Sequence, residues 1–203
     1  MRGRALTIAA LGLCAACREP DDAFDRPTDV AFDPRTQDAV VSDGYNHARV
    51  ARFTHDGSFL GDFGRRGAAA GELRTPHGVA VDEDGRIYVA DRENARVQVF
   101  RPNGELIDIW PSRLVGRPWA VAVGEDGHVY VVDGGDQDPA APRGGITKLT
   151  RDGRVVARFT TRTKSGPGGL DGAHAIALGS GGAVYLAESD GRRVRKLVPT
   201  TVR

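Results

Sequence analysis

The sequence predicts an all-β protein: a β-propeller of about four four-stranded blades, of which the last is incomplete. Three observations support this fold class. A pattern of roughly 40 residues recurs four times, apolar residues alternate within short runs, and Asp-Gly or Asn-Gly pairs separate those runs. With 203 residues, 27 of them Gly and 11 Pro, the chain is expected to form one turn-rich domain.

Each repeat supplies its elements in the same order. The repeats cover 27–64, 75–110, 117–160 and 172–198 and begin with "PTDVAF", "TPHGVAV", "RPWAVAV" and "GAHAIAL". An alternating apolar strand comes first, followed by a Gly turn, a second strand such as "IYVAD", a polar loop, a third strand such as "RVQVF", another Gly turn and a short outer strand. A linear β-solenoid is the structural alternative, but its repeats are shorter and contain fewer hairpins.

Ring closure is the open question of this fold. Four repeats lie at the lower limit of propeller size. The fourth repeat ends near Val198 without an outer strand, and residues 18–26, which are short and acidic, make a poor replacement. We therefore expect a tight four-bladed ring, an arc of a larger ring, or self-association through the edge that the missing outer strand leaves open.

The first 17 residues resemble an export signal that is separate from the domain. Two arginines precede the apolar run "ALTIAALGLCAAC", which is too short to span a membrane as a helix. Its last residues, Ala15-Ala16-Cys17, resemble a bacterial lipoprotein cleavage site. We expect residues 1–17 to be a signal peptide ending at a lipidated Cys17, residues 18–26 a linker and residues 27–203 the propeller. The alternative is an ordinary signal peptide in which Cys14 and Cys17 are incidental.

This segment predicts an exported lipoprotein that faces the periplasm or the cell exterior and touches the membrane only through its N-terminal lipid.

The charge balance excludes one class of partner. Lys and Arg total 28 against 27 Asp and Glu, which gives a formal net charge of +1. No broad positive field is available, so nucleic acid is not an expected partner.

The second repeat carries a family resemblance. Asp91, Asn94, Arg96 and Val97 follow "GVAVDEDGRIYVA" and resemble the NHL repeat. The segments "SDGY", "PHG" and "ADREN" resemble, more specifically, the catalytic core of peptidyl-α-hydroxyglycine α-amidating lyase. The match is nearly continuous over the first two repeats, and "HAIALGSGGAVYLAE" extends it into the fourth.

The resemblance implies a six-bladed propeller, of which this chain would form an arc, with zinc bound by three histidines from alternate blades. The equivalent positions here are Thr28, His77, Trp119 and His174, so His77 and His174 are the expected zinc ligands. Alternatively, each His could simply hydrogen-bond to neighbouring backbone where its strand starts. The third ligand position would have to be filled by another residue of this chain, for instance His47, or by water.

The resemblance also implies two catalytic residues. Tyr45 matches the family tyrosine that removes the proton from the substrate's α-hydroxyl, after which the carbinolamide collapses to a peptide amide and glyoxylate. A phenol titrates near pH ~10, so it needs a cation or a metal to act as a base near neutrality. Arg92 matches a family arginine and could provide that charge. Without catalysis, Tyr45 would be a surface aromatic and Arg92 a solvated turn residue.

The sequence departs from the family pattern at several points. The upstream blades, with one histidine and one arginine, have no counterpart. Ala175 replaces an aspartate that binds a structural calcium, so calcium is not expected, and Gly172 replaces a methionine near the metal.

Because of these departures, the second function class is a non-catalytic, surface-anchored propeller that binds a peptide, protein or glycan. A hydrolase is third, because no Gly-x-Ser-x-Gly elbow is present.

Other recurring polar residues are interpreted as repeat architecture. Asp43, Asp91 and Asp133 end the second strand of successive repeats, where a carboxylate can accept hydrogen bonds from the following loop. The recurring arginines, Arg49, Arg96 and Arg193, receive the same interpretation.

Overall fold

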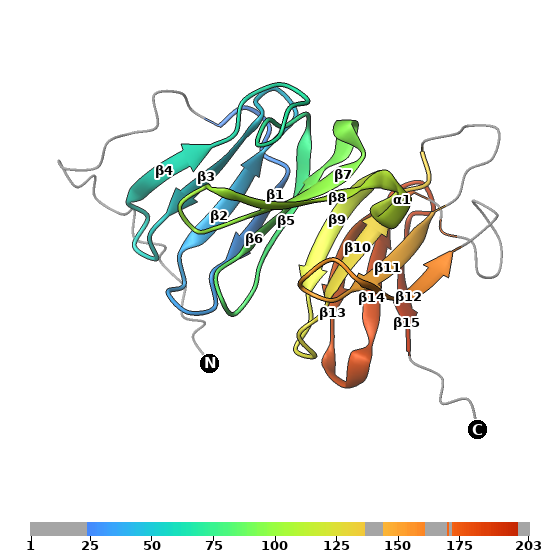
Figure 1. Ribbon diagram of the computed structural model, residues 1–203. Coiled ribbons are helices and arrows are strands. Elements are labelled where there is room, and N and C mark those ends of the chain that lie inside the picture. Colours follow the sequence, from blue (N-terminus) through green and yellow to red (C-terminus); the bar gives the residue numbers. More distant parts are fainter. Residues whose placement is uncertain (1–23, 137–143, 161–169, 171, 199–203) are drawn as a thin grey trace, which may run out of the picture.

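The computed structural model confirms an all-β propeller of four blades (Figure 1). It describes residues 24–136, 144–160, 170 and 172–198. The predicted signal peptide, Cys17 and most of the predicted linker lie outside the described residues. Within the described part of the chain, no helix has the length and apolar character required to cross a membrane.

Each blade is a meander in which consecutive strands pair antiparallel, in the order expected from hairpins. Blade one contains β1 (Asp29–Phe32), β2 (Ala39–Asp43), β3 (Arg49–Phe53) and β4 (Phe59–Phe63). Blade two contains β5 (Pro76–Val81), β6 (Ile87–Asp91), β7 (Arg96–Phe100) and β8 (Leu106–Pro111). Blade three contains β9 (Pro118–Val123), β10 (Val129–Asp133), β11 (Gly145–Leu149) and β12 (Val155–Thr160). Blade four contains β13 (Ala173–Leu178), β14 (Val184–Glu188) and β15 (Arg193–Leu197). The incomplete last blade is therefore confirmed among the described residues.

In the part of the chain that the structure describes, three short helical segments interrupt the strands. They are η1 (Arg92–Asn94), α1 (Ser112–Val115) and η2 (Ser180–Gly182). The sequence shows no helical periodicity at these places because a single turn is too short to establish one.

The predicted turn pairs form the hairpins. Gly57 and Gly153 have φ angles of 89° and 80°, in the left-handed region that glycine adopts without a steric penalty. In the first of these turns the Gly57 N–H donates to the Thr54 carbonyl at 2.9 Å, and the Thr54 N–H donates to the Ser58 carbonyl at 2.8 Å. A register shift follows in the flanking strands, as in a three-residue hairpin loop with a bulge. Local sequence is sufficient to define these turns.

Apolar clusters between adjacent blades make up the core. One joins blades one and two through Val50, Val79 and Val89, and a second joins blades two and three around Tyr88 and Trp110. The third joins blades three and four; its buried members include Ala120, Val132, Ile146, Val184 and Leu186. Alternation within each strand therefore serves two junctions, because successive side chains point to opposite faces of the blade.

The four blades form an arc rather than a tight ring. The innermost strands pack in succession, β1 on β5, β5 on β9 and β9 on β13. Among these described strands, β13 does not pack closely on β1, and the first and fourth blades lie at opposite ends of the molecule (Figure 1). Of the three outcomes expected from the sequence, the tight four-bladed ring is not the one observed.

Candidate functional site

Three equivalent side chains meet where the innermost strands start. His77, Trp119 and His174 are each the second residue of their strand, in β5, β9 and β13. The centroids of the two imidazoles are 4.8 Å apart, and Trp119 lies 5.0 Å from His77 and 4.9 Å from His174. The repeat alignment predicted this equivalence, and the structure adds that the three rings are in contact.

The tautomer of His77 follows from its surroundings. Its Nδ1 lies 2.7 Å from the Trp119 carbonyl oxygen, which can only accept, so Nδ1 carries the proton and donates. The imidazole is only 3% exposed, and burial lowers its pKa from 6.5 to about 4, assisted by the nearby charges of His174 and Arg92. His77 is therefore neutral at pH 7, with an unprotonated Nε2.

His174 is the more accessible imidazole. Partial burial lowers its pKa, and the Arg92 guanidinium lowers it further, while Asp29 acts in the opposite direction. Asp29 is on β1, in the first blade, and burial raises its pKa, although a hydrogen bond from the Val79 N–H at 3.1 Å and the nearby His174 lower it. Groups from the first and fourth blades thus share one central space.

Tyr45 lies in the loop between β2 and β3, with its ring 38% exposed. Its hydroxyl is 3.3 Å from His77 Nε2 and acts as the donor in this contact, because the unprotonated Nε2 can only accept. The Arg26 guanidinium lies 4.9 Å from the centre of the phenol ring. The sequence predicted the association of Tyr45 with His77, whereas Arg26 carries no motif that would have identified it.

Arg92 belongs to the same neighbourhood but has other partners than expected. Its guanidinium stacks 3.7 Å from the Trp119 ring centre and pairs with Asp136 at 2.9 Å and Glu93 at 3.2 Å. Arg117 pairs with the same two carboxylates. The closed group of two arginines and two acids is neutral overall. The cation that lies over the Tyr45 ring is consequently Arg26, not Arg92.

Several polar atoms around this group have no hydrogen-bond partner among the described residues, namely Arg92 Nε, Trp119 Nε1 and Asp136 Oδ1. Buried polar groups are normally paired, and leaving one unpaired costs about 1–3 kcal/mol. The two N–H donors and one acceptor form a polar surface beside the histidines that a polar ligand could satisfy.

The donor set fits zinc in part. Two neutral imidazoles in contact are suitable ligands, and His77 presents an unprotonated Nε2. No group of three or more His, Cys, Asp or Glu residues able to hold a metal occurs among the described residues. His47, the candidate third ligand, instead has its Nδ1 2.7 Å from Asp43 Oδ2. Ala175, at the position of the family's calcium aspartate, has no oxygen in its side chain to ligate calcium.

The recurring carboxylates have structural roles, as predicted. Asp91 is fully buried and accepts hydrogen bonds from the Arg74 N–H, Asn94, Arg96 and Gln98. The corresponding acids of blades one and four pair with the recurring arginines, Asp43 with Arg49 and Glu188 with Arg193. In blade three, Asp133 Oδ1 accepts from the Gly135 N–H at 3.0 Å.

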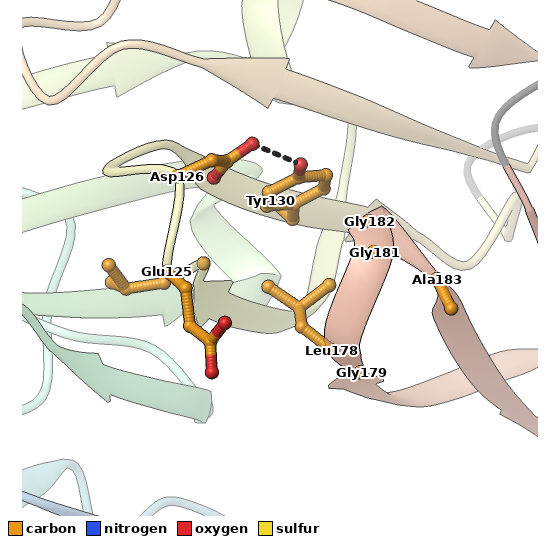
Figure 2. Close-up of a pocket in the computed structure, with 10 residues that line it drawn as sticks. Glu125, Asp126, Tyr130, Leu178, Gly179, Gly181, Gly182 and Ala183 are labelled. Atoms are coloured by element: carbon orange, nitrogen blue, oxygen red, sulfur yellow. Dashed lines mark hydrogen bonds between the residues drawn. The ribbon is translucent and has the colours of Figure 1, made fainter. Parts of the chain in front are cut away.

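A recess of about 370 Å³ lies at the opposite ends of β9 and β13, away from the histidines, between the turns of blades three and four (Figure 2). The Tyr130 hydroxyl donates to Asp126 Oδ2 at 2.8 Å, and Lys148 Nζ lies 2.7 Å from the same oxygen. Slight burial raises the pKa of Asp126, but these bonds outweigh it and bring the pKa to about 2. The Asp126 carboxylate is thus engaged by Tyr130 and Lys148, and no histidine is among the residues that line this recess.

Comparison with known proteins agrees with the fold and extends the resemblance. Residues 73–100 match the NHL repeat family. The chain is 31% identical over 188 residues to peptidyl-glycine alpha-amidating monooxygenase B of Xenopus laevis, covering 87% of this chain and 21% of that protein. It is 30% identical to the Mus musculus enzyme, over 89% of this chain and 19% of that protein. The similarity thus continues well beyond the first two repeats, while the chain spans about a fifth of these relatives.

Solved structures share the fold alone. The virginiamycin B lyase of Staphylococcus aureus superposes with a TM-score of 0.60 at 14% identity, covering 85% of this chain and 55% of that one. A protein of unknown function from Bacteroides caccae gives a TM-score of 0.61 at 17% identity, covering 82% of this chain and 57% of that one.

Proposed function

We propose that this NHL-repeat propeller, a homologue of the peptidyl-glycine alpha-amidating monooxygenases, is a zinc-dependent lyase that cleaves peptidyl-α-hydroxyglycine to a peptide amide and glyoxylate. The observation that carries the proposal is the state of His77. Its neutral imidazole presents Nε2 to the Tyr45 hydroxyl while its ring contacts His174. A metal ligand and a base would then share one small space.

The proposed zinc ligands are His77 and His174. Zinc would act as a Lewis acid that makes the substrate's α-hydroxyl easier to deprotonate. The chain's own contribution is orientation. The Trp119 carbonyl fixes the His77 tautomer, and the Trp119 ring contacts both histidines.

Tyr45 is proposed to move the proton. Its phenolate oxygen takes the proton of the α-hydroxyl, the C–N bond of the carbinolamide breaks as the C=O bond of glyoxylate forms, and the departing amide nitrogen receives that proton back from the Tyr45 phenol. The Arg26 guanidinium lies 4.9 Å from the centre of the same ring. Arg92, held over Trp119, is assigned to substrate positioning through its unpaired Nε rather than to activation of Tyr45.

The proposal predicts that the Tyr45 hydroxyl and zinc compete for one lone pair. In the structure the hydroxyl faces His77 Nε2, so metal binding requires it to move away. Tyr45→Phe should therefore bind zinc at least as tightly as the wild type, yet lose about a hundredfold to ten-thousandfold in turnover, the usual cost of removing a general base.

The experiment measures zinc content after mild purification, and then glyoxylate release from a peptidyl-α-hydroxyglycine. His77→Ala and His174→Ala should lose both, while His55→Ala, an exposed histidine on another hairpin, is the matched control and should retain both. Because two protein ligands hold zinc weakly, the assay includes added zinc and a chelator arm. Equal and negligible zinc in the wild type and the site variants would refute the lyase proposal.

The second candidate is a non-catalytic propeller that binds a peptide, protein or glycan at the same site, where His77, Trp119 and His174 meet. It is favoured by the neutralisation of Arg92, whose charge is balanced by Asp136 and Glu93. Binding of a peptide without glyoxylate release, unaffected by chelator, would favour this candidate.

A further inference from the structure

The two end blades present faces that are buried everywhere else in the molecule. At the start of each innermost strand, the same repeat position points to the preceding blade. Val79 and Val121 occupy it in blades two and three and are 3% and 4% exposed, whereas Val30, their equivalent in blade one, is 52% exposed. The face of blade one that points away from blade two is therefore half of a blade-to-blade junction.

Blade four presents the other half. The second position of each third strand points to the following blade. Val50 and Val97 occupy it in blades one and two and are fully buried, and Ile146 in blade three is 6% exposed. Their equivalent in blade four, Val194, is 71% exposed.

Both open faces carry exposed apolar side chains. On blade one, the paired rows contain Val30 beside Val41 and Phe32 beside Ala39, with Phe32 59% exposed. The chain's own Phe24 lies 5.7 Å from Phe53, which continues the second of these rows. On blade four, one row runs from Ala175 through Ala187 to Val194, all exposed, and the next row contains Ala177, Tyr185 and Lys196. Apolar surface is therefore available on both faces for a blade-to-blade junction.

We propose that a second copy of this chain covers these faces, so that blade four of each copy packs on blade one of the other. The occupant follows from the molecule itself, since the chain already makes this junction three times, between successive blades, and carries both unused halves. One chain cannot join its own halves, because β13 and β1 do not pack closely in the arc. A head-to-tail contact repeated around a two-fold axis forms a ring of two copies, which requires each four-blade arc to turn through half of the circle.

This assembly is independent of the proposed lyase activity and has a charge-swap test. Val30 and Val194 are the equivalents of residues that share one buried cluster at each existing junction. Each junction uses blade one of one copy and blade four of the other, so Val30→Lys alone or Val194→Glu alone damages both junctions. When the two variants are mixed, one junction of the mixed pair is wild type and the other joins Lys to Glu. The mixture should therefore recover the dimer that each variant has lost.

Multi-angle light scattering of the purified full chain, over a hundredfold range of concentration, measures the assembly. The wild type should be a dimer, each single variant a monomer and the mixture a dimer. Ile107→Lys, which changes an equally apolar and 42% exposed residue on the outer strand of blade two, is the control and should remain dimeric. Cooperative urea unfolding of the single variants establishes that they fold.

A monomeric wild type would overturn the proposal. So would single variants that stay dimeric, or a mass that grows without limit as concentration rises, since an open chain of copies is not the closed ring.

Discussion

Protonation of His77 should destabilise the fold at mildly acidic pH. The imidazole is buried and its pKa falls from 6.5 to about 4 on folding. As pH drops below 6.5 the unfolded chain takes up a proton that the folded chain refuses, so stability is complete above pH 6.5 and is lost progressively between pH 6.5 and 4. At about 1.36 kcal/mol per pH unit, the loss reaches about 2 kcal/mol at pH 5 and about 3 kcal/mol below pH 4.

Urea unfolding at pH 7.5, 6.5, 5.5 and 5.0, in the presence of a chelator, measures this loss. The reference is His77→Asn, which cannot titrate but keeps a neutral N–H donor for the Trp119 carbonyl oxygen. Between pH 7.5 and 5.0 the wild type should lose about 2 kcal/mol more than this variant. His174 titrates in the same direction but is present in both proteins, so its contribution cancels. Parallel losses in the two proteins would show that His77 does not stay neutral on folding.

Three further changes test other parts of the structure. In Gly153→Ala the new Cβ would lie 2.5 Å from Trp110 Nε1 at a φ of 80°, whereas Gly57→Ala meets nothing within 4 Å at a φ of 89°. Both should lose about 1 kcal/mol to backbone strain, and Gly153→Ala about 1–3 kcal/mol more to overpacking, as measured by urea unfolding. Asp136→Asn removes a carboxylate shared by two guanidiniums and should cost about 1–3 kcal/mol in the same assay; an unchanged midpoint would show that the network is dispensable. Cys17→Ser should release the protein from the membrane fraction or leave it unprocessed, and an unmodified N-terminus elsewhere by mass spectrometry would contradict lipidation.

The fold was predictable because its determinants are local. Alternation over five or six residues defines the two faces of a strand, and an Asp-Gly pair defines a hairpin, so the repeats reveal strands, turns and blades without knowledge of distant contacts. The same repetition aligns His77, Trp119 and His174, since each is the second residue of an innermost strand and these strands start at the same end of the blades.

The partners of the reactive side chains depended on how blades stack. Arg92, Glu93, Arg117 and Asp136 come from loops of different blades, and neither spacing nor pattern indicates that they form one neutral group. These contacts are set by the rotation from one blade to the next, which is a property of the packed junctions. Arg26, which precedes β1, lies over Tyr45 of the same blade, and no motif marks that contact.

Ring closure shows most clearly what the sequence determined and what the tertiary structure decided. The sequence by itself determined four repeats, the missing outer strand and the apolar alternation of every blade, but identical patterns give Val30 and Val79, or Val194 and Val97, opposite exposures. Only the tertiary structure decided which of these equivalent residues are buried. A blade face becomes interior when another blade covers it, and four blades whose end strands do not meet leave two faces uncovered.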